Sequence, residues 1–154
     1  MKRKNGFTLV EMLIVVVLIG AVLLIGWPKV AAGLAKTNLR SSRTTVANMF
    51  AKARAFAMQS NRTTSINFNG NNVVITASPR TLGGVGNTVD SIGGVEKLSE
   101  AYGVTLTPPG GVTPYSVAYD PRGFGSLGAV QKFVVARNSK RDSVMIDGLG
   151  RVIK

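Results

Sequence analysis

An apolar run with a single acidic residue near its start constrains this chain more than any other feature. The run covers Phe7 to Trp27 and follows a cationic head, Met1 to Asn5. A helix of this length, about 21 residues, spans about 32 Å, which is enough to cross the hydrocarbon core of a bilayer. Glu11 lies inside the run, and a charge within a membrane span is costly and usually kept for a specific partner. The cationic head predicts that the amino terminus stays in the cytoplasm.

Two simpler interpretations of the run remain to be weighed. A cleaved secretory signal would have a shorter apolar core followed by a small-residue cleavage site, whereas Gly26-Trp27-Pro28-Lys29 follows here. A plain single-span anchor fits the hydropathy, but an anchor gains nothing from Glu11. The carboxylate also has a local explanation, because the dipole of a helix stabilises a negative charge near its amino terminus.

The residues around Glu11 resemble a known leader. Lys-Arg-Lys-Asn-Gly followed by Phe-Thr-Leu-Val-Glu is similar to the class III leader of type IV pilins and type II secretion pseudopilins. The resemblance implies that a prepilin peptidase cuts after Gly6 on the cytoplasmic side and that Phe7 is then N-methylated. It also implies that the helix remains in the bacterial inner membrane until an assembly platform there moves the subunit into a filament of other pilins. In that filament Glu11 would pair with the Phe7 amine of a neighbouring subunit, which offsets the cost of burying both charges and sets the axial register.

The expected organisation is an α+β fold with a cleaved leader. Residues 1–6 are the predicted leader, and residues 7–28 are the predicted transmembrane or filament-core helix. Residues 29–62 are predicted to continue the helix in amphipathic form, and residues 63–154 to form an antiparallel β domain on which the helix packs, as in pilins. Pro28 lacks a backbone donor, so a kink is predicted there.

Hydrophobic spacing supports this division. Apolar residues follow a helical period to about Ser60, and from Ser65 the period changes to two. The predicted buried helix face consists of Leu39, Val46, Met49, Phe50, Ala53, Phe56 and Ala57. The predicted β elements are a hairpin over 65–76 around Asn69-Gly70, strands over 102–106, 116–119, 130–137, 143–146 and 151–153, a turn over 138–142, and a loop over 79–94.

The charge distribution points to an anionic partner. The formal net charge is +12, and no acidic residue lies between Glu11 and Asp90. Basic residues on one side of the predicted helix form a stripe without an acid: Lys29, Lys36, Arg40, Arg43 and Arg54. A solvated face is the ordinary explanation of such a stripe, but membrane lipid headgroups, nucleic acid or acidic neighbour subunits would also suit it.

Later segments resemble one branch of the pilin superfamily, the GspH/FimT group of minor pseudopilins and minor pilins. The matching segments are Ala51 to Arg62, Asp120 to Gly125, and Val144 to Val152. Some members of this group bind DNA during natural transformation through a carboxy-terminal Gly-Arg-x-Arg. Here Gly150 and Arg151 match that motif, but Ile153 stands in place of the second arginine.

The incomplete motif still leaves basic residues that would contact phosphate of double-stranded DNA without reading its sequence. They are Arg151, Lys154, Lys140 and Arg141. A charged hairpin end on a basic protein is the simpler explanation of the same residues.

Three functions are compatible with these features, and catalysis is disfavoured. The first is a minor pilin or pseudopilin that helps prime or cap a filament, and the second is a DNA-binding receptor at a pilus. A major pilin is a further alternative, and both a type IV pilus and a type II secretion pseudopilus suit the leader. The chain has no Cys and no His, which excludes a thiol nucleophile, a His-based triad and a Cys/His metal site. No paired-acid motif or phosphate loop is present, so neither a cofactor nor a metal is expected.

Overall fold

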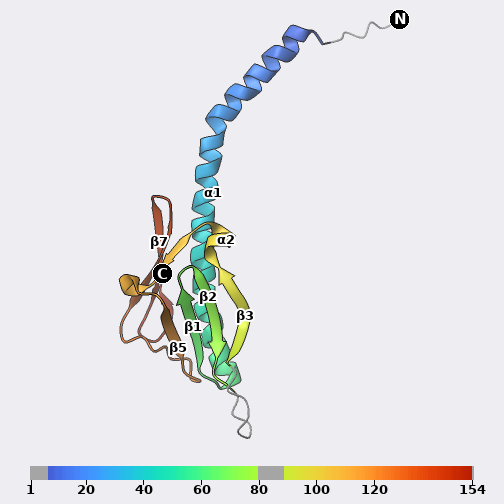
Figure 1. Ribbon diagram of the computed structural model, residues 1–154. Coiled ribbons are helices and arrows are strands. Elements are labelled where there is room, and N and C mark those ends of the chain that lie inside the picture. Colours follow the sequence, from blue (N-terminus) through green and yellow to red (C-terminus); the bar gives the residue numbers. More distant parts are fainter. Residues whose placement is uncertain (1–6, 80–88, 154) are drawn as a thin grey trace, which may run out of the picture. The chain divides into compact units, whose positions relative to one another are not determined.

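The computed structural model describes residues 7–79 and 89–153, so the predicted leader with Gly6, and Lys154 at the other end, lie outside the described residues. The contacts divide the chain into two units, Met1–Lys36 and Thr37–Lys154. The elements are α1 (Leu9–Ser60), β1 (Thr64–Asn69), β2 (Asn72–Ala77), β3 (Asp90–Lys97), α2 (Leu98–Tyr102), β4 (Thr105–Thr107), a 3-10 turn (Pro109–Gly111), β5 (Tyr115–Tyr119), β6 (Gln131–Arg137), β7 (Lys140–Ile146) and β8 (Val152–Ile153) (Figure 1).

Both ends of α1 have clear causes in the sequence. Thr8 precedes the helix, and its hydroxyl oxygen accepts a hydrogen bond from the backbone N–H of Glu11 at 3.2 Å. This is half of a capping box, which satisfies an orphan donor of the first turn. At the other end Asn61 adopts a left-handed conformation (φ 53), and the N–H of Arg62 bonds to the carbonyl of Ala57 at 3.3 Å. The predicted end at about Ser60 is therefore confirmed, and the helix runs through Pro28.

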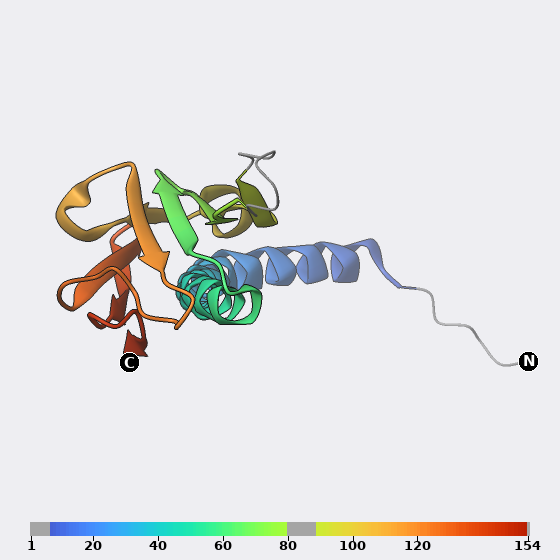
Figure 2. The same cartoon turned by 90° about the horizontal axis from the view of Figure 1, so that it is seen from below.

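The second half of α1 supplies one wall of the core. Phe50 is fully buried, and its ring lies 5.7 Å from that of Phe68 in β1 and 5.0 Å from that of Phe133 in β6. Figure 2 looks along this part of the helix and shows the strands gathered on part of its circumference. The predicted face is confirmed, because Leu39, Val46, Phe50, Ala53 and Ala57 are buried while Met49 and Phe56 are half-buried.

The strands form two four-stranded sheets, and within each sheet every described pair of neighbouring strands is antiparallel. The first sheet has the order β3-β2-β1-β5, and the second has the order β4-β6-β7-β8. The predicted first hairpin is confirmed, with Asn69 paired to Asn72 across a two-residue turn. Gly70 in that turn has φ 60, which glycine adopts without steric cost.

The predicted loop over 79–94 is wrong in its last part, because β3 begins at Asp90. This strand lies at a sheet edge and most of its residues are exposed, so burial imposes little alternation of apolar and polar residues on it. Gly93 and Gly94 both have positive φ, and the register with β2 shifts between Val74 and Thr76. A bulged, exposed, glycine-containing strand leaves little period-two signal. Residues 80–88 of the predicted loop lie outside the described part of the chain.

Two further boundaries differ from the prediction. The strand expected over 102–106 occupies Thr105–Thr107, because the short helix α2 extends to Tyr102 and ends at Gly103 in a left-handed conformation (φ 62). The turn expected over 138–142 is shorter, since Arg137 pairs directly with Lys140 across Asn138 and Ser139.

Candidate functional site

The first unit carries an apolar helix surface without a partner inside the described chain. The segment is long and apolar enough to cross a membrane by length and composition, and none of its most apolar window is buried. Leu9 is 82% exposed, Leu24 is 80% exposed and Trp27 is 72% exposed. Because burial of one such side chain contributes about 1.5–3 kcal/mol, this surface favours insertion into lipid or packing against other helices.

Glu11 lies in the first turn of this apolar helix, where its carboxylate complements the helix dipole. Its backbone is capped by Thr8, and within residues 7–79 and 89–153 its side chain forms no ion pair. Phe7, the predicted new amino terminus, is 72% exposed. The local explanation of Glu11 therefore has a structural basis, and the carboxylate itself remains available for a partner.

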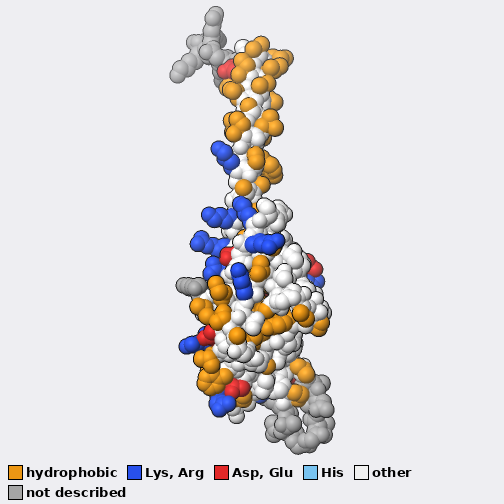
Figure 3. Space-filling view, turned by 90° about the vertical axis from the view of Figure 1, so that its left-hand side faces the viewer, with side chains coloured by type: hydrophobic (Ala, Val, Ile, Leu, Met, Phe, Trp, Pro, Cys, Tyr) orange, Lys and Arg blue, Asp and Glu red, His pale blue; other side chains and the backbone are white. Residues whose placement is uncertain are grey.

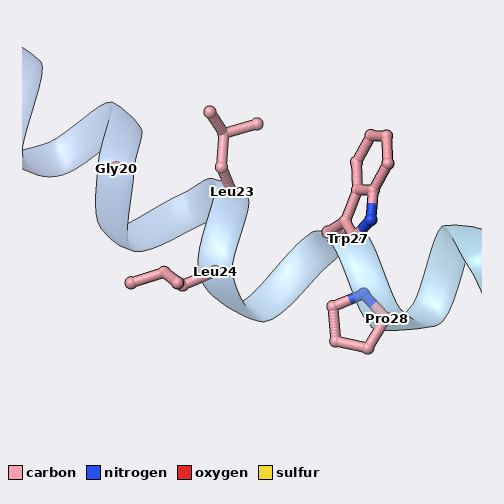
Figure 4. Close-up of a pocket in the computed structure, with 5 residues that line it drawn as sticks. All are labelled: Gly20, Leu23, Leu24, Trp27 and Pro28. Atoms are coloured by element: carbon pink, nitrogen blue, oxygen red, sulfur yellow. The ribbon is translucent and has the colours of Figure 1, made fainter.

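A shallow apolar hollow lies farther along the same helix. It is lined by Gly20, Leu23, Leu24, Trp27 and Pro28. Figure 4 shows Leu23 and Trp27 on one side of the helix, with Gly20 contributing no side chain. A Cβ added at Gly20 would meet no atom within 4 Å. The hollow adds surface relief to the exposed helix, which suits packing against another helix.

In the second unit, the basic stripe is less free than the sequence indicated. Arg43 forms an ion pair at 3.6 Å with Asp142 of β7, and the Arg54 side chain donates a hydrogen bond at 2.9 Å to the carbonyl of Gly123. The stripe itself contains no acidic residue, but the sheet brings the distant Asp142 to Arg43. Arg40 remains exposed, as does Lys36 within the first unit.

Arg62 is a buried side chain with a structural role, and the sequence did not distinguish it from its basic neighbours. It is 8% exposed, and it donates hydrogen bonds to the carbonyl of Ser78 and to the Asp90 carboxylate, the latter at 2.7 Å. These bonds tie the end of α1 to the end of β2 and the start of β3. The one available signal was that Asp90 is the first acid after Glu11 in the chain.

Two of the three segments that resemble the GspH/FimT group, Asp120 to Gly125 and Val144 to Val152, contain the same kind of turn. Asp120 accepts hydrogen bonds from the N–H groups of Arg122 and Phe124, and Asp147 accepts them from Leu149 and Arg151. In each turn the N–H of the fourth residue, a glycine, bonds back to the aspartate carbonyl.

Electrostatics within these turns follow from that geometry. The hydrogen bond from the Phe124 N–H is the main cause that lowers the pKa of Asp120, and the Arg122 side chain lowers it further. The Arg151 N–H has the same effect on the pKa of Asp147, supported by the Arg151 side chain. The Arg151 Nε lies 2.7 Å from the Asp147 carboxylate. Much of the charge offered by Arg151 is therefore compensated inside its own turn.

The structure separates the residues predicted to contact DNA. Lys140 and Arg141 begin β7, whereas Arg151 follows the far end of that strand. Six residue steps along a strand correspond to about 20 Å. The structure instead brings the start of β7 to α1 through the Arg43–Asp142 ion pair. Lys154, the fourth residue predicted to contact DNA, lies outside the described residues.

Comparisons with known proteins give one match for the amino-terminal segment and one for the fold. Residues 1–27 match the family described as the prokaryotic N-terminal methylation motif. The fold is similar to that of the type IV minor pilin FimU of Pseudomonas aeruginosa strain PAO1 in two crystal forms. One form has a TM-score of 0.58 at 17% identity and covers 77% of this chain and 88% of that chain. The other has a TM-score of 0.54 at 16% identity and covers 75% and 90%. No curated protein sequence matches. The predicted pilin-like α+β fold is therefore confirmed.

Proposed function

We propose that this type IV pilin-like protein is a minor pilin or pseudopilin subunit. It would assemble into a type IV pilus or a type II secretion pseudopilus and help to prime or cap the filament. The observation that carries the proposal is the exposed apolar helix after a methylation-motif leader, with one carboxylate, Glu11, near its start. A structural subunit of a filament needs such a surface, because it packs first in lipid and then against other helices. The pilin-like fold supports the same conclusion without indicating a catalytic site.

The proposed order of events follows the chain. Prepilin peptidase removes residues 1–6 after Gly6, and Phe7 is methylated. Residues 7–28 hold the subunit in the inner membrane with the amino terminus in the cytoplasm, and Pro28 kinks the helix at the end of this span. Residues 29–62 and the β domain over 63–154 lie on the extracytoplasmic side, from which an assembly platform incorporates the subunit among other pilins.

Glu11 is the residue proposed to set register in the filament. After cleavage the Phe7 amine lies within about one helical turn of it along the chain. The Glu11 side chain has no ion-pair partner among the described residues. Pairing with the amine of a neighbouring subunit offsets the cost of burying both charges in an apolar filament core.

Processing and incorporation test the proposal together. The tagged full chain is expressed in a bacterium with a prepilin peptidase and a pilus or pseudopilus, and the sheared filaments are analysed by mass spectrometry. We expect the chain to begin at N-methylated Phe7 and to be present at a small fraction of the main subunit. The Gly6→Ala variant should stay uncut in the inner membrane. Normal cleavage of that variant, or absence of the wild-type chain from filaments, would overturn the proposal, and a dominant amount would favour a major pilin.

A DNA-binding receptor at a pilus is the second candidate. The net charge of +12 and the Gly150-Arg151 pair favour it, although Asp147 holds the Arg151 side chain. A gel shift with double-stranded DNA, titrated with salt, separates the candidates. Salt-sensitive binding that is lost in the Arg151→Ala, Lys154→Ala double variant supports the receptor. No binding at low salt leaves the filament subunit.

A further inference from the structure

A group of cations lies at the end of the β domain where α1 enters it. We define this basic end by four residues, Arg40 of α1 and Arg137, Lys140 and Arg141 of the β6–β7 hairpin. The Arg43–Asp142 ion pair shows that the hairpin lies beside the helix. Arg40 lies one helical turn before Arg43, and Lys140 lies two residues before Asp142 toward the hairpin tip. Figure 3 shows Lys and Arg side chains gathered over this face.

The acidic residues near the basic end are already engaged. Asp142 pairs with Arg43, and Glu100 of α2 pairs with Lys97 at 3.0 Å. Arg137 approaches α2 from the hairpin and donates a hydrogen bond to the carbonyl of Tyr102 at 2.7 Å, which leaves its charge uncompensated. Within the described residues, none of the four cations of the basic end forms an ion pair. The surface therefore keeps an excess of positive charge.

This surface follows the proposed anchor closely in the sequence. Arg40 comes 12 residues after Pro28, a stretch of chain that spans about 18 Å when it is α-helical. Headgroups occupy about 5–8 Å beyond each side of the hydrocarbon core. The attraction of a charged surface extends for a further Debye length, about 8 Å at physiological salt. Headgroups and one Debye length together extend about 13–16 Å from the hydrocarbon core. The long Arg40 side chain can cover the remaining few ångströms to this zone. Lys29 and Lys36 lie between Pro28 and Arg40 in the sequence and are closer still to the proposed anchor.

Lipid suits this position better than DNA does. Arg40 follows the proposed anchor closely in the sequence, and a bilayer surface is present beside that anchor until the subunit is assembled. Arg151, the residue that the DNA motif offers, lies at the other end of β7 and is held by Asp147. We propose that the basic end binds phosphate groups of anionic phospholipids and holds the domain at the extracytoplasmic membrane surface before assembly. This inference rests on the membrane anchor of the proposed function.

The test uses the full chain in a non-ionic detergent, titrated with phosphatidylglycerol or phosphatidylcholine of the same acyl composition. Bound lipids are counted by native mass spectrometry. We expect several-fold more bound phosphatidylglycerol than phosphatidylcholine. The triple variant Arg40→Gln, Lys140→Gln, Arg141→Gln should lose this preference. Arg137 is left unchanged because of its bond to Tyr102.

A charge-matched control separates the site from the total charge of the protein. The triple variant Lys52→Gln, Arg122→Gln, Lys132→Gln removes three exposed cations elsewhere on the domain and should keep the lipid preference. The cationic head, which also attracts anionic lipid, is common to all three proteins. Circular dichroism checks that each variant is folded.

Several outcomes would overturn the proposal. They are an unchanged preference in the first triple variant, an equal loss in the control, displacement of lipid by inorganic phosphate at the same concentration, and binding of a DNA duplex in place of lipid. The readout needs neither cleavage nor a filament. Failure here with normal filament incorporation would therefore remove the lipid site and leave the proposed function standing.

Discussion

The hydroxyl of Tyr119 donates a hydrogen bond to the carbonyl oxygen of Gly150 at 2.7 Å. Tyr119 is fully buried at the end of β5 in the first sheet, and Gly150 belongs to the turn that follows β7 in the second. Beside this bond, the N–H of Gly125 donates to the carbonyl of Leu149 at 3.0 Å. The two sheets are thus joined through two aspartate–glycine turns. Burial raises the pKa of Tyr119 well above its ordinary range, so the phenol keeps its proton.

Tyr119→Phe should destabilise the β domain without changing its fold. The substitution keeps the ring in the core but leaves the Gly150 carbonyl without its donor, which costs about 1–3 kcal/mol. The urea midpoint of the full chain in mild detergent, followed by near-ultraviolet circular dichroism, measures the loss. Tyr115→Phe is the matched control, because the described contacts of Tyr115 are with rings. Equal midpoints for the two variants would show that the hydroxyl of Tyr119 does not join the sheets.

Gly150→Ala should be more damaging than an alanine at another glycine of the same region. Gly150 has φ 79, and a Cβ there would overlap the ring of Tyr119. The left-handed conformation alone costs about 1–2 kcal/mol for a residue with a side chain, and the overlap adds to it. Gly128→Ala meets no atom within 4 Å, so it should leave stability within about 1 kcal/mol of wild type. Thermal unfolding of the two variants compares them, and similar melting temperatures would contradict the argument.

The domain should lose stability in acid through Asp147 and Asp120. The pKa of each carboxyl is lowered in the folded chain, first by a backbone hydrogen bond, from Arg151 and Phe124 respectively. The unfolded chain therefore binds protons first. The stability from these groups is complete above the ordinary carboxyl pKa of about 3.9 and is lost as pH falls below it. Urea midpoints between pH 7 and pH 3 should fall less steeply for Asp147→Asn than for wild type. An identical slope would show that Asp147 does not contribute.

Patterns that one element carries by itself were predictable from the sequence. The helix end at Ser60, its buried face and the hairpin around Gly70 follow from local periodicity and turn chemistry, and all three are confirmed. The strand β3 was missed because an exposed edge with a bulge imposes no alternation. The periodicity of apolar residues therefore indicates which face of an element is buried, and it gives little information about an element that is mostly exposed.

One contact of the candidate site joins residues far apart in the sequence, and another depends on the shape of a turn. Asp142 pairs with Arg43 across nearly a hundred positions, and charge spacing along the chain gives no signal for this pair. Asp147 and Arg151 are only four residues apart, but they pair because the turn after β7 folds back. The sequence indicated a basic surface, whereas the division of its cations into paired and unpaired ones depends on the folded chain.

Arg62→Met should destabilise the chain more than Asp90→Asn, although the two residues form one ion pair. Arg62 is 8% exposed and also bonds to the carbonyl of Ser78, so its loss leaves a partly buried acceptor unsatisfied at a cost of about 1–3 kcal/mol. The Asp90 side chain is 55% exposed and regains water, so its loss should cost at most about 1 kcal/mol. Urea midpoints of the two variants rank them, and the reverse order would assign the stability to the ion pair rather than to the Ser78 contact.

Variants at Thr8 and Glu11 separate the two roles proposed for the start of α1. Thr8→Ala removes the cap, which costs about 1 kcal/mol of helix stability, and leaves the carboxylate in place. Glu11→Gln keeps the backbone donor and the side-chain size but removes the charge. If Glu11 pairs with the amine of a neighbouring subunit, both variants should still be cleaved after Gly6. Thr8→Ala should then enter filaments nearly as wild type does, whereas Glu11→Gln should be depleted from the filaments.

Quantitative mass spectrometry of sheared filaments and of membranes measures how much of each variant is incorporated. Equal depletion of both variants would assign Glu11 to helix capping alone, and wild-type incorporation of Glu11→Gln would remove its role in register.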